Sequence, residues 1–425
     1  MSEREQDKKR FMIGSEKVWD VIIVGAGAAG MMCAIHAARA GFHVLLLEGQ
    51  KRVGAKILMS GGTRCNVTNQ EVTEKDFASE NIRFVRHVLQ SFSSNEALEF
   101  FQGRGVDLVL EEGGKYFPQT GRAETILEVL LKGLGDEKVT LREGMKVRKI
   151  IKKDAYFRIQ GDSFDELSQS LVLATGGLSY PTTGSDGTGY RLAENLGHYL
   201  VPTSAALTPF LTDDPLWKSL MGVSLPVRLS LWVQNRKIRE FCGPFLFTHF
   251  GFSGPTALNM SRFWDREKGL GKELRVQFLW DQERDVFERV LIKNTDEKPR
   301  GFVKSFLSEM LPDRLAGVLL LKGQFDERLR LHQLKKEDRR RLIEILFSCP
   351  LSAAGVFGFR KAEVTAGGVD LTKVDSASLQ SKITPGLFFC GEILDVDGRI
   401  GGFNFQWAWS SAVVASRGIR KYLED

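Results

Sequence analysis

The N-terminal part of the chain carries a short apolar run that is typical of a buried parallel strand. Residues 20–24 read Asp-Val-Ile-Ile-Val, and an alanine- and methionine-rich run follows at 31–40 after a glycine-rich turn. A second apolar run occupies 44–47. Because continuous β-branched runs are typical of strands that are buried on both faces, we predict a strand–turn–helix–strand unit over 20–47.

The turn between this strand and this helix has the spacing GxGxxG. The first glycine allows the tight turn, the second lets the backbone approach a pyrophosphate, and the third lets helix and strand pack closely. The helix N-terminus offers N–H groups to phosphates. An acid after the second strand accepts hydrogen bonds from ribose hydroxyls and disfavours the 2′-phosphate of NADP. The predicted dinucleotide-binding residues here are Gly25, Gly27, Ala28, Ala29, Gly30 and Glu48.

The stretch after Glu48 favours FAD over NAD. Residues 49–69 read GQKRVGAKILMSGGTRCNVTN, a glycine-rich polar segment where an NAD dehydrogenase normally continues into a helix and a third strand. Such a loop can lie extended along a long ligand, and its basic side chains can reach phosphate oxygens. A surface loop with solvated charges is the alternative interpretation. The candidate cofactor residues of this loop are Lys56, Ser60, Gly61, Gly62, Arg64 and Asn66.

Two later segments have features that are typical of chain segments in contact with a flavin. Short strands at 147–151 and 156–159 precede an apolar run at 171–173, which ends in an Ala-Thr-Gly turn. Near the C-terminus an acid follows the strand 386–389, and a glycine pair then opens a helix. Such an acid can bind ribitol hydroxyls, and the helix N–H groups can face the flavin pyrimidine edge. The residues predicted to contact FAD are Val147, Ala174, Thr175, Gly176, Gly391, Glu392, Gly401, Gly402, Phe403 and Asn404.

Composition excludes several classes of protein. The chain has 425 residues, 43% hydrophobic and 26% charged, which is typical of a globular protein and not of a disordered one. No apolar run reaches the ~18–20 residues that a membrane helix needs, and residues 1–18 lack the apolar core of a secretory signal. Five scattered cysteines without a CxxC pair argue against a structural zinc site and a disulfide framework, so we predict no metal and a cytoplasmic protein.

The motifs together resemble the BaiN/RdsA (YhiN-like) family of bacterial NAD(P)/FAD-dependent flavoproteins, which includes aminoacetone oxidase-like members. They cover nearly the whole chain, in the order of the family. One departure is Thr63, which stands where many members carry a glycine; since a β-branched residue disfavours positive φ, we expect ordinary φ there. The matching segments are VGAGAAG at 24–30, KILMSGGTRCNVTN at 56–69, ATGGLSYPTTGSDGTGY at 174–190, ALTPF at 206–210, FTHFGFSGPTAL at 247–258, TAGGVD at 365–370 and GRIGGFNFQWAWSS at 398–411.

The resemblance implies an α/β fold with a split, glutathione-reductase-like Rossmann FAD domain. That domain would comprise 1–200 and 350–425, and 201–349 would form an inserted substrate domain with a β-barrel-like part and a helical part. The residue pattern independently supports this division. Alternating runs such as 227–233 mark 201–280 as β-rich, and the remainder to 349 has helical stretches, such as 335–347.

His249 and Cys65 are the candidate catalytic residues. His249 lies in the family motif THFGFSGP and can contact substrate or deliver a proton, although a structural hydrogen bond explains it equally well. Cys65 lies in the loop expected near the flavin, where its thiol can protonate a carbon; a small packed residue is the alternative. Basic runs at 142–153 and 328–341 are consistent with RNA contact or with solvated helix faces.

The resemblance implies an FAD-dependent reductase of a carbon–carbon double bond. Its leading substrate is uridine in large-subunit ribosomal RNA, reduced to dihydrouridine, with NAD(P)H as a transient reductant because no second GxGxxG unit is present. The alternatives are a small-molecule flavoenzyme, either an amine oxidase or a reductase of enones or bile acids, and a nucleic-acid-binding flavoprotein without turnover. The sequence leaves the RNA and small-molecule readings open, and gives no oligomeric state.

Overall fold

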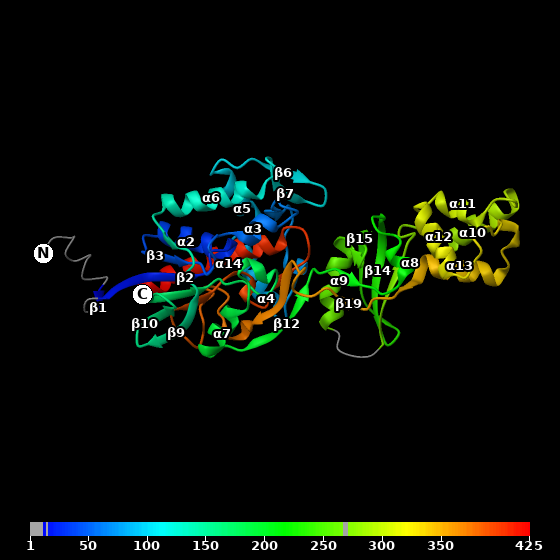
Figure 1. The fold of residues 1–425 in the computed structure, drawn as a ribbon. Coiled ribbons are helices and arrows are strands. Elements are labelled where there is room, and N and C mark those ends of the chain that lie inside the picture. Colours follow the sequence, from blue (N-terminus) through cyan, green and yellow to red (C-terminus); the bar gives the residue numbers. More distant parts are fainter. Residues whose placement is uncertain (1–11, 14–15, 267–270) are drawn as a thin grey trace. The chain divides into compact units, whose positions relative to one another are not determined.

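The computed structural model describes residues 12–13, 16–266 and 271–425 (Figure 1). The chain divides into two compact units, one formed by residues up to Ser204 together with Glu363–Asp425, the other by Ala205–Ala362. From the sequence we predicted the two boundaries between these units at 200/201 and 349/350. The second division lies further along because the short strands β18 (Cys349–Leu351) and β19 (Gly355–Val356) pair within the second unit.

The first unit is built on a mainly parallel sheet. Its strand order is β8-β3-β2-β11-β10-β9, with β1 paired to β2 and β21 paired to β11. The pairs formed by β2 with β3 and β11, by β3 with β8, and by β11 with β21 are parallel, whereas β9, β10 and β11 form an antiparallel edge. The strands are β1 (Met12–Ile13), β2 (Glu16–Val24), β3 (Val44–Leu47), β8 (Thr140–Arg142), β9 (Val147–Lys153), β10 (Tyr156–Gly161), β11 (Asp165–Leu173) and β21 (Leu387–Phe389).

Helices pack against this sheet in a shared apolar core. α2 (Ala28–Arg39) buries most of its residues, and α14 (Phe403–Glu424) packs against it although the two are far apart in the sequence (Figure 1, blue and red). The other helices are α3 (Ala55–Met59), α4 (Ile82–Ser91), α5 (Ser94–Gln102), α6 (Ala123–Asp136) and α7 (Thr188–Asn195). Smaller pairings use β4 (Thr68–Asn69), β5 (Phe77–Ala78), β6 (Leu108–Glu111), β7 (Lys115–Pro118), β12 (Leu200–Ala206), β20 (Val364–Val369) and β22 (Asp397–Gly398).

The second unit combines an antiparallel sheet with a group of helices. The sheet has the order β18-β17-β14-β15-β16-β13-β19, and alternate residues of β14 (Ser224–Val233) are buried, as the alternating run at 227–233 predicted. The further strands are β13 (Phe210–Leu211), β15 (Arg236–Phe247), β16 (Gly251–Ser253) and β17 (Lys272–Gln277). The helices are α8 (Pro215–Lys218), α9 (Pro255–Arg266), α10 (Arg284–Glu297), α11 (Val303–Ser308), α12 (Asp313–Lys322) and α13 (Lys336–Ser348).

The predicted strand–turn–helix–strand unit is confirmed. β3 has the predicted bounds, and β2 begins four residues before the predicted start at Asp20. The C-terminal helix, which the small-residue run at 407–416 predicts, extends from Phe403 to Glu424, because the residues on either side of that run continue the helical pattern of buried positions. The two units therefore separate the residues predicted to bind cofactor, all in the first, from the insertion.

Candidate cofactor site

The glycines of the β2–α2 turn differ in what surrounds them. Gly25 has φ +106°, and a Cβ there would lie 2.5 Å from the carbonyl oxygen of Ala174. A Cβ on Gly30 would collide with the carbonyl oxygen of Gly25, whereas a Cβ on Gly27 would meet nothing within 4 Å. No side chain caps α2 at Gly27. Gly25 and Gly30 are thus needed for packing, whereas Gly27 leaves open space at the N-terminus of α2, where a phosphate can bind.

Glu48 follows β3 and supports the same turn. Its Oε2 accepts a hydrogen bond from the backbone N–H of Ala26 (2.9 Å), and its Oε1 accepts one from Gln50 (2.8 Å). Burial raises the pKa of Glu48, against these N–H groups, which lower it. A carboxylate held in this way keeps lone pairs for ribose hydroxyls.

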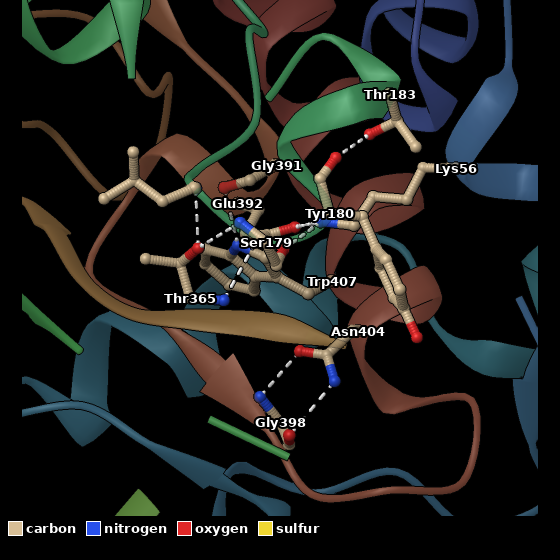
Figure 2. A network of polar contacts seen from close by, with 11 residues as sticks. Lys56, Ser179, Tyr180, Thr183, Thr365, Gly391, Glu392, Gly398, Asn404 and Trp407 are labelled. Atoms are coloured by element: carbon tan, nitrogen blue, oxygen red, sulfur yellow. Dashed lines mark hydrogen bonds and ion pairs between the residues drawn. The ribbon is translucent and has the colours of Figure 1, made fainter. Parts of the chain in front are cut away.

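A network of polar side chains joins α3 to the C-terminal segment (Figure 2). Lys56 forms an ion pair with Glu392 and donates a hydrogen bond to Ser179 Oγ (2.5 Å). Ser179 Oγ donates to Glu392 Oε1 (2.7 Å), which also accepts from the backbone N–H of Thr365 (2.9 Å). Lys56 and Glu392 were both predicted as cofactor residues. Ser179 and Thr365 were missed; they lie in the motifs at 174–190 and 365–370, but motif membership does not reveal which side chains meet.

The loop at 60–66 has an unusual backbone. Gly61, Gly62, Thr63 and Cys65 all have positive φ, between +56° and +69°. The expectation of ordinary φ at Thr63 is therefore wrong. Its carbonyl accepts a hydrogen bond from the N–H of Ala123 (2.9 Å), and Cys65 N–H bonds to Ser60 O (3.1 Å), so tertiary contacts outweigh the local preference of a β-branched residue.

Arg64 turns toward a neighbouring hairpin. Its guanidinium forms an ion pair with Glu111 of β6 and lies 4.1 Å from the ring centroid of Phe117 of β7. The structure thus gives Arg64 a role in holding the hairpin to the loop. Its contact with a phosphate stays a prediction, as does that of Lys56, which is held by Glu392.

The N-terminus of α14 approaches this loop closely. Gly402 has φ +92°, and a Cβ there would lie 2.6 Å from the backbone of Thr68 and 2.8 Å from Asn66 Oδ1. No side chain caps the helix at Gly402. Asn404 Nδ2 donates to Gly398 O and its Oδ1 accepts from Gly398 N–H (Figure 2), which fixes the turn before the helix. Gly401 has φ +132° and Phe403 is fully buried, so the whole turn is tightly packed.

Gly391 links the two helix N-termini. A Cβ on Gly391 would lie 2.8 Å from Cβ of Ala29, in the first turn of α2. Its carbonyl accepts a hydrogen bond from Trp407 Nε1 of α14 (3.1 Å). The segment that carries Glu392 is therefore held against both helices.

Buried polar atoms test whether a cofactor fits here. Asn66 Oδ1, Thr175 Oγ1 and the hydroxyl of Tyr190 are buried and have no hydrogen-bond partner among the described residues. Asn66 lies beside Gly402 at the N-terminus of α14, and Thr175 lies beside Gly25 of the β2–α2 turn. Because buried polar groups are nearly always satisfied, unpartnered atoms beside two uncapped helix N-termini suit a long polar ligand. Ala174 and Gly176 flank Thr175, and Gly176 has φ +70°. Together, these unpartnered oxygens and the two open helix N-termini fit FAD.

Val147 is the first residue of β9, and it follows a segment that is hydrogen-bonded to Glu48. The N–H of Met145 bonds to Glu48 O (2.7 Å), which brings the segment before β9 alongside the end of β3.

In the same segment, Lys146 forms an ion pair with Asp186 (2.5 Å). Partial burial raises the pKa of Asp186, but hydrogen bonds from Lys146 and Thr188 outweigh it and lower the pKa to about 2.

The two candidate catalytic residues belong to different units. Cys65 is fully buried in the first unit, and burial raises the pKa of its thiol to about 12. His249 is exposed in the turn between β15 and β16 of the second unit, beside the ring of Phe250 (4.8 Å between centroids). The catalytic roles of both residues stay predictions.

A family comparison agrees with the architecture. The HI0933-like protein Rossmann domain model matches residues 19–418. The chain belongs to the HI0933-like family. This confirms the resemblance predicted from the motifs, and the HI0933-like chain is an oxidoreductase of the FAD-binding Rossmann class, as its sequence predicted.

Three curated relatives align along nearly their whole length. A ribosomal RNA dihydrouridine synthase of Escherichia coli is 36% identical over 93% of this chain and 96% of its own. One of Haemophilus influenzae is 34% identical over 94% and 98%. A 3-dehydro-bile acid delta(4,6)-reductase of Clostridium scindens is 32% identical over 93% and 97%.

A solved structure supports the fold of this HI0933-like chain. The 3-ketosteroid delta1-dehydrogenase of Sterolibacterium denitrificans matches 95% of this chain and 99% of its own, with a TM-score of 0.50 and 12% identity. At this identity the likeness concerns the fold alone. Among the described residues, no helix has both the length and the apolar character needed to cross a bilayer.

Proposed function

We propose that this protein uses FAD and NAD(P)H to reduce a carbon–carbon double bond, and that its substrate is a uridine of large-subunit ribosomal RNA in the cytoplasm. The observation that carries the proposal is the end-to-end similarity to two relatives named ribosomal RNA dihydrouridine synthase. The open, uncapped N-terminus of α2 and the buried unpartnered atoms of Asn66 and Thr175 support FAD as the cofactor.

The first unit supplies the groups that would hold FAD. The α2 N-terminus would bind the pyrophosphate, Glu48 a ribose hydroxyl, and the α14 N-terminus the pyrimidine edge of the flavin. Lys56 and Ser179 hold Glu392 in place, so its carboxylate is oriented before a ligand binds. When bound, FAD supplies hydride-transfer chemistry.

The overall reaction must also deliver a proton. The C5=C6 bond of uracil gains a hydride and a proton, while NAD(P)H becomes NAD(P)⁺. The thiol of Cys65 is protonated at neutral pH, and burial, which raises its pKa to about 12, makes it a weak acid. It can serve as donor if the loop at 60–66 lies against substrate. His249 is exposed, so it is accessible to a substrate of any size.

A second candidate is the reduction of a small enone. It is favoured by the relative named 3-dehydro-bile acid delta(4,6)-reductase, which aligns over as much of the chain. Both candidates reduce a carbon–carbon double bond, so they differ in the substrate and not in the chemistry.

Flavin reoxidation tests the proposal. Purified protein is reduced anaerobically with NADH or NADPH, and the visible flavin absorbance is followed after addition of in vitro transcribed large-subunit ribosomal RNA. We expect reoxidation together with dihydrouridine in the RNA. Reoxidation by a 3-oxo-Δ4 steroid or bile acid but not by RNA would select the second candidate. Cys65→Ala and His249→Asn, assayed in the same way, identify the proton donor as the variant whose reoxidation rate falls while its flavin content stays.

A further inference from the structure

Two segments of the second unit run side by side and carry basic side chains. The N–H of Val303 bonds to Leu329 O, and the N–H of Leu331 bonds to Gly301 O, both at 2.9 Å. Phe302 and Arg330 face each other across an antiparallel bridge between them. The N-terminus of α13 follows directly. We give the name basic ribbon to Phe302 and the cations of these two segments and of the first turns of α13, which are Arg300, Arg328, Arg330, Lys336 and Arg340.

The cations of the basic ribbon lack acidic partners. No described carboxylate lies within ion-pair distance of these four arginines or of Lys336. Other cations of the same helical part are paired, as Arg284 is with Glu344 and Lys298 with Glu309. Three exposed acids lie near these cations in the sequence: Asp326, Glu327 and Glu337. Asp326 accepts a hydrogen bond from the backbone N–H of Arg328, and Glu327 pairs with Lys304. The ribbon therefore carries excess positive charge that neighbouring side chains do not neutralise.

An exposed aromatic ring lies among these charges. Phe302 is 40% exposed, and the guanidinium carbon of Arg330 lies 5.2 Å from its ring centroid. Arg330 Nη1 donates to Arg300 O (3.1 Å), which holds the guanidinium near the ring. An accessible ring beside arginines is the combination that binds single-stranded nucleic acid, because bases stack on the ring while phosphates pair with the cations.

We propose that the basic ribbon binds the RNA substrate, through phosphate contacts of Arg300, Arg328, Lys336 and Arg340 and a base stacked on Phe302. This rests on the proposed function, and it places substrate binding in the second unit while the residues predicted to bind FAD lie in the first. Phosphate contacts of this kind carry no sequence information, so the ribbon contributes affinity and not the choice of uridine.

Neutralisation of the ribbon tests the inference. The variant R300Q/R328Q/R340Q is compared with wild type in its Kd for in vitro transcribed large-subunit ribosomal RNA, at several salt concentrations. We expect Kd to rise at least about tenfold at low salt, and the slope of log K against log salt to become less steep by about 2. Phe302→Leu should raise Kd by about fivefold or more with an unchanged salt slope.

A matched variant controls for loss of charge alone. K132Q/K373Q/K421Q removes three exposed lysines from the first unit, all outside the basic run at 142–153, and should leave the Kd unchanged. Flavin content and thermal melting show that each variant is folded. If the ribbon variant binds RNA with the Kd of wild type, the inference is overturned. It is also overturned if the control variant loses more RNA affinity than the ribbon variant.

The two proposals fail in different ways. If wild-type protein binds RNA through the ribbon but RNA does not reoxidise its flavin, the proposed function fails and the binding surface stands. If RNA reoxidises wild type and the ribbon variant with the same KM, the function stands and the surface fails. Wild-type protein that does not bind this RNA overturns both.

Discussion

Lys56 and Glu392, separated by most of the chain, form a partly buried ion pair in the first unit. Ser179 and the backbone of Thr365 complete the hydrogen bonds of the carboxylate (Figure 2). Four segments are thus joined at one acid: α3, the turn after β11, β20 and the segment after β21. Since breaking a buried pair leaves an uncompensated charge, this acid should matter for stability as well as for FAD.

Glu392→Gln is expected to lower the free energy of unfolding by about 1–3 kcal/mol, because Lys56 keeps its charge without a partner. Urea unfolding of the wild type, Glu392→Gln, Lys56→Met and the double variant measures the coupling. The double variant should lose less than the sum of the two single losses. Additive losses would show that the two side chains do not interact.

Gly27→Ala and Gly30→Ala should separate cofactor binding from folding. A Cβ on Gly27 meets nothing, so the variant should unfold as wild type does but bind FAD about tenfold or more weakly, since the methyl group obstructs a pyrophosphate at the helix N-terminus. Gly30→Ala should destabilise the protein by about 1–3 kcal/mol, because its Cβ collides with the backbone of Gly25. Melting of the apoprotein and FAD titration measure both. An unchanged FAD affinity in Gly27→Ala would contradict the phosphate role.

Thr63→Gly is expected to raise stability by up to about 1 kcal/mol. Positive φ costs a non-glycine residue ~1–2 kcal/mol, which glycine avoids. Part of this stabilisation is lost because glycine increases the conformational entropy of the unfolded chain. Thr63→Val keeps the branched Cβ and loses the hydroxyl that donates to Gly62 O, so it should not stabilise. Thermal melting compares the two variants, and a Thr63→Gly protein that melts below wild type would show that the loop is not strained.

His198 should make stability depend on pH in the acid range. Burial lowers its pKa to about 4 from 6.5, its Nε2 lies 2.8 Å from Ser381 Oγ, and its ring packs against Phe389. The unfolded chain therefore binds a proton between pH 6.5 and 4 that the folded chain does not bind. The stability contribution of neutral His198 is present above pH 6.5 and falls by up to about 3 kcal/mol as pH drops toward 4.

His198→Phe checks this assignment. Urea unfolding at intervals from pH 7 to 4 should give a flatter profile for the variant than for wild type, whatever its stability at neutral pH. Profiles of equal slope would mean that another group binds the proton.

The sequence by itself determined the elements around the cofactor. The GxGxxG turn, the acid at 48 and the buried strands depend on local spacing and on apolar periodicity, and the structure has β2, α2 and β3 within four residues of the predicted bounds. The Rossmann class and the family followed from the same local patterns. Such features are readable because each is encoded within some thirty residues.

Tertiary structure decided which side chains meet. Nothing in the sequence pairs Lys56 with Glu392, adds Ser179 and Thr365, turns Arg64 toward Glu111, or predicts positive φ at Thr63. The basic run at 328–341 likewise resolved into paired and unpaired cations, with Phe302 brought beside Arg330 by a bridge between distant segments. These outcomes depend on long-range packing and hydrogen bonds, whose energies exceed the local preferences that the sequence reveals.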